Sequence, residues 1–523
     1  MKKFIILFLG CSVIALAGCK KDLTISNPNT PTVANFWKTS NDALLGINAA
    51  YSTFHREGIS RWLYFMTMIR ADEGFSTSPN PAIVNIYDAF NITDYNDYLV
   101  TSVWQDDYIG INRANQVLDN VPGINMDDAL RQQYISEAQF LRGWFYYSLA
   151  TLYGNVPILL HSSESSDQPA TAPQAQVFAQ AAADFTAAAA GLPVSYDAAN
   201  VGRATKGAAY AMLGKTYLQL RQYQQAHDAL QWLTEGPGAA QYSLTPSYRD
   251  NFIETAENNP ESVFEIQFAV NPNDAFDNDQ GDGDPSHTPD RLNYGTSIPP
   301  FFAPSPIGFT DGQARRWVVS QFLGETTTTG ARDPRLAATF LYDSTDPRGP
   351  AFTQAYGRPW DSLGLQNTPD NIHNSVHEVC FRKELDDATM NGEVFHSGNN
   401  WRYIRYADVL LLYAEALNGL GQDAAAYPFV DRVRARAGLA PLSTARPGLT
   451  GAAFLDQLKH ERITELTGEG HRWEDLARWG DLNPSIASRD PGFANFVIGK
   501  DEFLPIPQSE IDLNPNLQQN PGW

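Results

Sequence analysis

The sequence has little cysteine, few basic residues and no long apolar run beyond its first residues. It holds 3 Cys, and 37 Lys and Arg face 59 Asp and Glu among 523 residues, so the formal net charge is −22. A chain this acidic is repelled by a phosphate backbone, which argues against nucleic acid as a partner. Charged residues make up only 18% of the chain and hydrophobic residues 43%, which excludes a disordered acidic polymer and a coiled coil. What remains is an acidic globular protein in which 12% of the residues are aromatic.

The one apolar run lies at the N-terminus. Lys2 and Lys3 precede residues 4–17, which as a helix would reach only about 21 Å against roughly 30 Å of bilayer hydrocarbon. The run is therefore typical of a signal peptide rather than of a membrane span. It ends in LAGC at 16–19, which resembles the lipobox of a bacterial lipoprotein. We expect residues 1–18 to be removed and Cys19 to carry the lipid.

Nine later segments have apolar residues at three- and four-residue steps, the pattern of amphipathic helices. In one of them Ala138, Leu141, Phe145 and Leu149 form the stripe, and Gly154 ends it. Most of these segments come in adjacent pairs. The predicted helices are 43–54, 104–118, 127–153, 174–190, 205–220, 223–233, 403–420, 424–437 and 452–466.

One pair of predicted helices carries a repeat signal. Gly214, Tyr217, Tyr223 and Ala226 stand at the offsets of the tetratricopeptide pattern, in which a Gly lets two helices approach while aromatic and Ala side chains fill the seam. Residues 410–437 fit a second hairpin of this kind. Such hairpins must stack to bury their faces, and the curved surface that results usually docks a protein.

Two irregular blocks, 59–103 and 242–400, separate the helices. The second includes a strand-like run at 262–270 (SVFEIQFAV), but it consists mostly of Pro, Gly, Asn and Asp among aromatic residues. Stretches of this length without regular structure inside a compact domain are expected to be functional.

Six groups of residues, in order along the chain, resemble the SusD/RagB family of nutrient-binding outer-membrane lipoproteins. Each group is common alone, but six in this order behind a lipobox are specific. They are NFWK at 35–38 with AAY at 49–51, YIGI at 108–111, the block 137–157 with FLR and LYG, IRYADVLL at 404–411 with YAEA at 413–416, the block 433–479, and PIP at 505–507 with QNPGW at 519–523.

This resemblance implies a mainly α-helical fold, with a tetratricopeptide-repeat scaffold of about four helix hairpins and long irregular loop excursions. It divides the chain into the signal peptide 1–18, an N-terminal region 19–240 with its excursion at 59–103, and a C-terminal region 241–523 with its excursion at 242–400. It also implies that the protein caps a SusC-like TonB-dependent transporter at the cell surface, held to the outer membrane by lipid on Cys19. The repeat face would meet the transporter, and the irregular blocks would hold glycan fragments.

The aromatic residues of the irregular blocks suit a sugar ligand. A pyranose presents C–H groups on its faces and hydroxyls at its rim, so a ring takes the face while Asp, Asn, Gln or Arg bonds the rim. Taken singly, each ring is more often a packing residue, because large rings dominate protein cores. The family's ligand residues do not lie in its shared motifs, so the prediction is one of region. We predict ligand contacts at Asp72, Phe75, Tyr87, Tyr95, Tyr294, Trp317 and Trp360, with Tyr98, Phe301 and Phe302 as further rings of the same blocks.

Other patterns argue against a cofactor, a metal or a catalytic residue. Five Asp between 274 and 284 lie in a loop that could converge on calcium, but they miss the EF-hand spacing, so a solvated acidic loop is the better interpretation. His373 and His377 lack the Glu that a zincin needs directly after its first His, and Gly214-Lys215-Thr216 lacks the first Gly of a phosphate loop.

The run 461–478 is dense in charge. Glu469, Arg472, Asp475 and Arg478 stand three apart, as neighbours on a helix do. We interpret them as a partly buried network that locks the C-terminal helices onto the scaffold, rather than as a catalytic acid and base.

Two rivals to a binding lipoprotein stay open. A surface glycoside hydrolase would need two carboxylates about 5 to 10 Å apart across a cleft, one with a raised pKa, and 59 acidic residues leave room for such a pair. A purely structural tetratricopeptide scaffold is the other, and it would leave the long aromatic excursions without a role.

Overall fold

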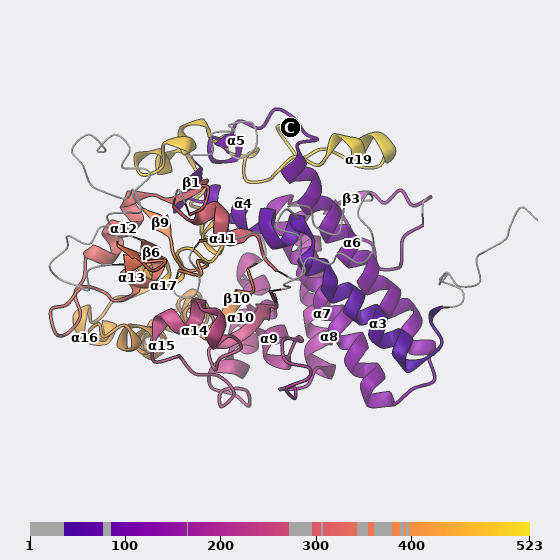
Figure 1. Ribbon diagram of the computed structural model, residues 1–523, viewed down its shortest axis with the longest axis horizontal. Coiled ribbons are helices and arrows are strands. Elements are labelled where there is room, and N and C mark those ends of the chain that lie inside the picture. The colour runs from indigo at the N-terminus through magenta and orange to yellow at the C-terminus, as the bar shows by residue number, and fades with distance from the viewer. Residues whose placement is uncertain are drawn as a thin grey trace, which may run out of the picture.

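The structure is a computed structural model that describes residues 36–76, 85–164, 166–270, 295–304, 307–341, 354–359, 379–387, 392–393 and 397–523. The predicted signal peptide, Cys19, the acidic loop at 274–284, His373 and His377 lie outside these residues. Helices dominate the described chain, which confirms the expected mainly α-helical fold (Figure 1).

The helices are α3 Ser40–Tyr51, α4 Tyr64–Ile69, α5 Asn85–Asp88, α6 Tyr98–Asn120, α7 Asp128–Leu152, α8 Gln174–Gly191, α9 Lys206–Gln219, α10 Tyr223–Thr234, α11 Ile298–Phe302, α12 Arg316–Leu323, α13 Arg335–Thr339, α14 Tyr406–Gly419, α15 Asp423–Arg436, α16 Leu442–Ala445, α17 Gly451–Leu466, α18 Arg472–Trp479 and α19 Gln508–Leu513. Short 3₁₀ turns and one π-helix, η2, complete them: η1 Ser52–His55, η2 Gly58–Leu63, η3 Val121–Gly123, η4 Tyr248–Phe252, η5 Glu254–Ala256, η9 Pro484–Ser488 and η10 Pro491–Asn495.

The strands are short and form two-stranded antiparallel sheets. The pairs are β1 Gly74–Ser76 with β5 Gly312–Ala314, β2 Val156–Pro157 with β3 Thr171–Ala172, β4 Ser262–Ile266 with β10 Trp401–Arg405, β6 Phe340–Leu341 with β9 Cys380–Phe381, and β7 Gln354–Ala355 with β8 Arg358–Pro359. The strand expected at 262–270 is thus present as β4. The pairs β1–β5, β4–β10 and β6–β9 tie together segments far apart in sequence, whereas β7 and β8 form a local hairpin, so the sheets hold loops in place rather than forming a layer.

All nine predicted helices are present. Helix α6 begins six residues before its predicted start because Asp97 caps it, with the Asp97 carboxylate accepting a hydrogen bond from the backbone N–H of Leu99 at 3.0 Å. The expectation that 59–103 is irregular is wrong at its beginning, where η2 runs directly into α4. Every residue from Gly58 to Ile69 is buried, so this segment lacks the polar face by which an amphipathic helix is recognised.

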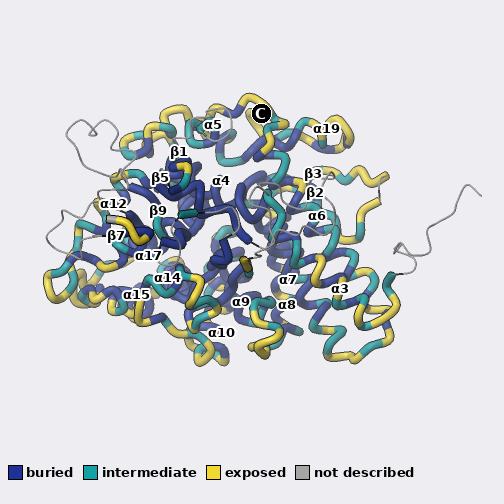
Figure 2. Tube along the Cα trace, in the orientation of Figure 1, coloured by how far each residue is buried: buried dark blue, intermediate teal, exposed yellow. Residues whose placement is uncertain are grey.

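Consecutive helices pack on one another, from α6 through α7, α8 and α9 to α10, which packs on α14; α14 in turn packs on α15 and α17 (Figure 1). Their seams are close. A Cβ at Gly214 of α9 would lie 2.4 Å from Cγ of Leu230 on α10, as the small residue of the repeat signal suggested. The helical hairpins are therefore real, and their tetratricopeptide identity stays a prediction. Buried residues fill the middle of the molecule and exposed ones lie on its outer turns (Figure 2).

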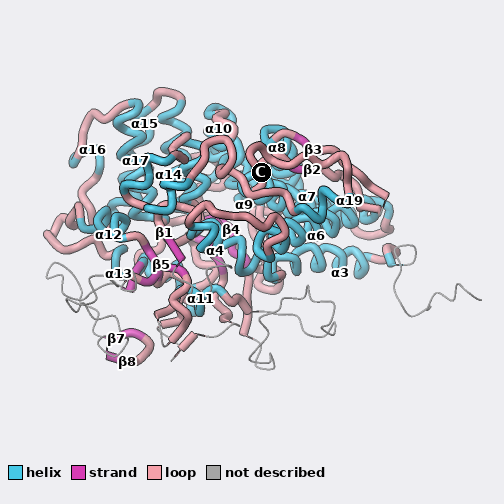
Figure 3. Tube along the Cα trace, turned by 90° about the horizontal axis from the view of Figure 1, so that it is seen from above, coloured by secondary structure: helices cyan, strands magenta, loops and turns pink. Residues whose placement is uncertain are grey.

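The molecule has two unlike faces. Figure 3 shows α11, β7 and β8 on one side and the helices α10, α14 and α15 on the other. We call the first side the loop face. Within the described ranges, no helix combines the length and the hydropathy that a bilayer span requires.

The predicted charge network is buried, but most of its predicted pairs are wrong. Of the three predicted pairs, one is present, between Asp475 and Arg478. Gly468 and Gly470, both at φ 84°, separate Glu469 from α18, and within α18 Arg472 pairs with Asp72 rather than with Asp475. The other charges find distant partners instead. Arg472 pairs with Asp72 at 2.7 Å, and Glu469 accepts from Arg405 at 2.6 Å.

Arg405 is the centre of a buried ionic cluster. Its guanidinium reaches Glu261 at 2.5 Å, Glu469 at 2.6 Å and Glu465 at 3.0 Å, and all four side chains are completely or almost completely buried. A buried charge is tolerated only when it is paired and hydrogen-bonded. The cluster therefore joins β10, α17 and the segment before β4 into one unit.

The C-terminal segment packs against the end of α7. The backbone N–H of Leu504 donates to the Leu152 carbonyl at 2.8 Å. The Asn520 side-chain amide donates to the carbonyls of Tyr153 at 2.6 Å and Leu504 at 3.0 Å. Residues 152–153 thus complete their hydrogen bonds with groups more than 300 residues later.

Candidate functional site

A run of aromatic rings extends from the start of α6 to the turn after α11. Tyr98 contacts Trp62 with ring centroids 6.4 Å apart, Trp62 contacts Phe301 at 5.6 Å, and Phe301 contacts Phe309 at 5.7 Å. The two middle rings are buried, whereas Tyr98 is 55% and Phe309 51% exposed. We call these four residues the aromatic surface. Among the large apolar side chains exposed on the described chain, Tyr98 and Phe309 are the aromatic ones.

Buried side chains hold the middle of the aromatic surface rigid. The Arg61 guanidinium lies 5.1 Å from the ring centroids of both Trp62 and Phe301, and its Nε donates to Ser297 at 2.6 Å. Phe65 packs edge-to-face on Phe301 with ring centroids 5.9 Å apart. Such cation–π and edge-to-face contacts fix ring orientation, so the exposed rings are presented by a preformed base.

A carboxylate lies beside the exposed ring of Tyr98. Glu57 accepts hydrogen bonds from the Tyr98 hydroxyl at 2.5 Å, from Trp62 Nε1 at 3.0 Å and from Arg61 at 2.7 Å. Burial and the hydrogen bond to Glu57 raise the pKa of Tyr98 above its ordinary value, so its hydroxyl stays protonated. An aromatic face with hydroxyl, carboxylate and guanidinium groups at its edge is the arrangement that a sugar ring can use.

The turn that presents Phe309 is strained. Thr310 adopts φ 62°, a left-handed conformation that β-branched residues rarely take. The turn is held there by hydrogen bonds from the backbone N–H groups of Phe309 and Thr310 to the carbonyls of Pro300 at 2.7 Å and Ala303 at 3.0 Å. Gly308 permits the close approach, since a Cβ there would lie 2.5 Å from the Pro300 oxygen. Local strain of this kind gathers at functional sites.

Two of the predicted ligand residues, Asp72 and Trp317, meet in a second cluster, beside β1 and β5. Asp72 is fully buried and pairs with Arg472 and with Arg489, whose Nη2 lies 2.5 Å from the carboxylate. Burial acts to raise the pKa of Asp72, but the two guanidinium groups outweigh it and hold the pKa below its ordinary value. Half-buried Trp317 donates from Nε1 to the Asp72 carbonyl at 2.5 Å and has the Arg489 guanidinium 4.8 Å from its ring. Phe75 is buried.

The remaining predicted residues are scattered. Tyr87 is fully buried and donates its hydroxyl to Asp97, while half-buried Tyr95 packs edge-on against Trp523 at 5.7 Å. Tyr294 and Trp360 lie outside the described residues. The seven residues therefore do not form one surface among the described ranges, and the list stays a prediction.

Sequence reasoning passed over Trp62 and Phe309. Trp62 lies in η2, inside a block taken as irregular, and Phe309 follows a Pro-rich stretch with no periodic pattern. Tyr98 and Phe301 were recognisable as rings of the irregular blocks. Their pairing, however, joins segments about 200 residues apart in the chain, and no local pattern encodes it.

Three hollows of the described chain differ in their carboxylates. One of about 330 Å³ has Glu265, and one of about 410 Å³, between α7, α9 and the loop after α18, has Glu502. A third, of about 20 Å³, is lined by both Glu469 and Glu474 but is too small to hold a sugar ring. Glycoside hydrolysis generally uses two carboxylates across a cleft. No group of three or more His, Cys, Asp or Glu in the described part of the chain is arranged to hold a metal ion.

Known proteins resemble this chain in sequence and fold. Residues 215–523 match the model of the SusD family, and residues 65–218 match a model described as starch-binding associating with outer membrane. SusD-like protein P2 of Formosa agariphila is 26% identical to the chain over 100% of both. The crystal structure of a SusD superfamily protein from Bacteroides vulgatus has 25% identity and a TM-score of 0.79, covering 93% of this chain and 100% of its own. A laminarin-binding SusD-like protein has 26% identity and a TM-score of 0.75 at the same coverage.

The SusD family model spans more than half of the chain, and a second related model covers most of the rest. The six sequence motifs and the helical fold with its loop face agree with this match. The resemblance found in the sequence is thus confirmed: the chain belongs to the SusD family.

Proposed function

We propose that this protein is a non-catalytic surface lipoprotein that binds oligosaccharides and delivers them to a SusC-like TonB-dependent transporter of the outer membrane. The observation that carries the binding part is the aromatic surface, where Tyr98 and Phe309 are half-exposed on a buried ring base. Exposing aromatic rings to water is unfavourable, and a ligand that stacks on the rings removes that apolar area from water. The name of the laminarin-binding relative supports a glycan as the ligand.

The two exposed rings, at opposite ends of the aromatic surface, suit an extended ligand better than a single sugar. Three successive ring contacts separate Tyr98 from Phe309, and the buried rings between them form the floor. A chain of sugars could place one face on each exposed ring while its hydroxyls reach Glu57 and Arg61 at the edge. Asp72, Phe75, Tyr87, Tyr95, Tyr294, Trp317 and Trp360 remain proposed ligand residues of the neighbouring loops.

The delivery part rests on the family match and on the two faces of the molecule. The paired helices lie opposite the loop face, so they are free to meet a transporter while the loops hold a ligand (Figure 3). The lipobox at Cys19 and the outer-membrane wording of the second family model support attachment to that membrane. Recovery of a large β-barrel protein with this chain from detergent extracts, and its loss when the chain is absent, tests the partnership.

Glycan binding is tested by removing the exposed rings. In affinity electrophoresis and calorimetry with laminarin, starch and a panel of other neutral glycans, Tyr98→Ala and Phe309→Ala should each weaken binding about threefold to tenfold, and the double variant more. Leu513→Ala is the matched control, because Leu513 is an exposed apolar side chain on α19, outside the aromatic surface. Unchanged affinity in the double variant would refute the site. Release of reducing ends from a bound glycan would instead support the hydrolase alternative.

A further inference from the structure

A second hollow lies away from the aromatic surface, between the loop that joins α8 to α9 and the loop that joins α10 to β4. It has a volume of about 330 Å³. Small-molecule sites in proteins occupy roughly 300 to 1,000 Å³, so this hollow fits one or two sugar-sized rings. Its entrance is open, since Val194, Ser195, Val201, Gln241 and Asn258 are exposed.

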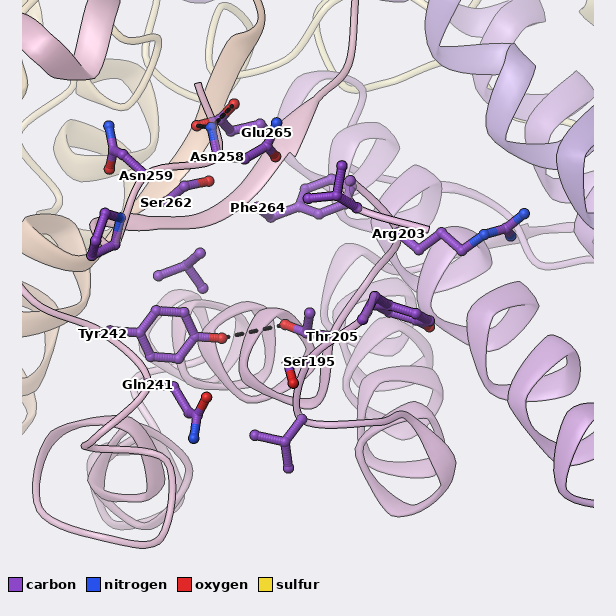
Figure 4. A pocket seen from close by; sticks show the side chains of 16 residues that line it. Ser195, Arg203, Thr205, Gln241, Tyr242, Asn258, Asn259, Ser262, Phe264 and Glu265 are labelled. Atoms are coloured by element: carbon purple, nitrogen blue, oxygen red, sulfur yellow. Dashed lines mark hydrogen bonds between the residues drawn. The ribbon is translucent and has the colours of Figure 1, made fainter. Parts of the chain in front are cut away.

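Neutral polar groups surround the hollow. In Figure 4, Ser195 and Gln241 lie on one side and Asn258, Asn259 and Ser262 on the other, with the Tyr242 ring between them. The Tyr242 hydroxyl is 3.3 Å from the Thr205 hydroxyl. The side chains thus offer amides and hydroxyls, which both donate and accept hydrogen bonds, around an aromatic ring.

Three of these polar side chains lack a hydrogen-bond partner in the part of the chain that the structure describes. The side chains of Ser195, Gln241 and Ser262 make no hydrogen bond to any other residue in the described ranges. Fold stability does not require these three groups, so they are available to a ligand.

The two charged residues of the lining are already paired. Arg203 donates to Glu137 at 2.8 Å, to Asn48 at 2.7 Å and to Asn200 at 3.2 Å, and its guanidinium points away from the other labelled side chains in Figure 4. Buried Glu265 accepts from the backbone N–H of Asn258 at 3.1 Å and from Asn400 at 3.0 Å. The hollow therefore has no unpaired charge to hold an ionic ligand.

The backbone keeps the hollow open. Gly202 in its wall adopts φ 91°, and a Cβ there would lie 2.4 Å from Cγ of Gln267. Gln267 in turn exchanges side-chain hydrogen bonds with Asn258 at 2.9 and 3.1 Å. This wall is set by the fold and does not depend on a bound molecule.

We propose that this hollow is a second binding site, for a neutral polyhydroxylated ring such as a mono- or disaccharide. The class follows from the Gln241 amide and the Ser195 and Ser262 hydroxyls, which make no hydrogen bond in the described ranges, together with the Tyr242 ring and the paired charges. The proposal stands whether or not the aromatic surface binds glycans. The same chemistry fits a free disaccharide or the end of a longer chain.

The test fills the hollow without disturbing the fold. Ser195→Trp places a large ring at an exposed lining position, and Ala198→Trp, at an exposed position of the same loop outside the lining, is the matched control. Saturation-transfer NMR and calorimetry are run with maltose, cellobiose, laminaribiose and the corresponding hexasaccharides, in chains that carry Tyr98→Ala and Phe309→Ala. We expect binding to at least one of these sugars. Its affinity should fall tenfold or more with Ser195→Trp and about threefold to tenfold with Gln241→Ala, and should not change with Ala198→Trp.

Each outcome decides. Binding that survives the loss of the two exposed rings and disappears with Ser195→Trp supports the second site, and a gain from disaccharide to hexaose identifies the chain end as its ligand. No binding to any probe in those chains, or equal binding with Ser195→Trp and Ala198→Trp, overturns it. Binding lost only through Tyr98→Ala and Phe309→Ala supports the aromatic surface and also overturns the second site.

Discussion

Replacement of Arg472 by alanine separates a structural role from a ligand-binding one. The Arg472 guanidinium forms two hydrogen bonds to Asp72, at 2.7 and 3.1 Å, and the carboxylate is completely buried. Breaking a buried ion pair costs about 3 to 5 kcal/mol, because a charge is left without its partner. Arg489 keeps its own contact with Asp72 at 2.5 Å, so we place the loss near the lower end, at about 3 kcal/mol.

This loss is measurable by heat denaturation. Unfolding entropies near 60 °C are about 2.1 cal/mol/K per residue, which for a chain of this length is about 1 kcal/mol/K. A loss of about 3 kcal/mol then lowers Tm by about 3 °C in a single cooperative transition. Arg446→Ala serves as control, since Arg446 is exposed and its side chain has no recorded partner in the described ranges; it should change stability by less than about 0.5 kcal/mol.

A double-mutant cycle then assigns the loss to the pair. Asp72→Asn and Arg472→Ala together should cost less than the sum of the single losses, because each single change already removes the interaction. In the described ranges Arg472 contacts no residue of the aromatic surface, so glycan affinity at that surface should stay close to that of the unsubstituted chain. A ligand role of Asp72 or Trp317, which Arg472 contacts, would instead weaken binding. Additive losses would refute the pair, and weaker glycan binding at unchanged Tm would refute the structural role.

Two further predictions concern the core and the helix seam. Burial raises the pKa of Glu73 to about 8 from an ordinary 4.5, so its contribution to stability is fully present below pH 4.5 and is lost as pH rises toward 8. The Tm of Glu73→Gln should therefore rise relative to that of the unsubstituted protein as pH goes from 5 to 8. Parallel curves of Tm against pH would contradict this. Gly214→Ala should lower the free energy of unfolding by about 1 to 3 kcal/mol in chemical denaturation, because its Cβ would meet Leu230. Leu230→Ala removes that clash, so the double variant should lose less than the sum of the two single losses. Additive losses would show that the seam is not the cause.

The helices were predictable because their information is local. A stripe such as Ala138, Leu141, Phe145 and Leu149 encodes both the helix and its buried face, and α7 follows it to within a residue at each end. The segment 58–69 escaped prediction because burial on all sides removes the polar face. The charges of 461–478 were correctly taken as a buried structural network, but their partners were not predictable, since Arg472 finds Asp72 four hundred residues away.

The candidate site was predictable only as a region. The irregular blocks are visible in the sequence by their Pro, Gly and aromatic content, and Tyr98 and Phe301 belong to them. Whether a ring is exposed or buried depends on which distant segment covers it, however. Tyr87 and Phe75 are covered, whereas Tyr98 and Phe309 are half open, and their sequence neighbours do not differ in a way that distinguishes the two cases.

The attachment of Leu504 and Asn520 to the end of α7 has a consequence for biogenesis. During translation, Leu504 and Asn520 are added some 350 residues after residues 152–153. Helix α7 therefore leaves the ribosome long before the groups that hydrogen-bond to its C-terminal end have been synthesised. The end of α7 acquires these hydrogen bonds only after nearly the whole chain has been made.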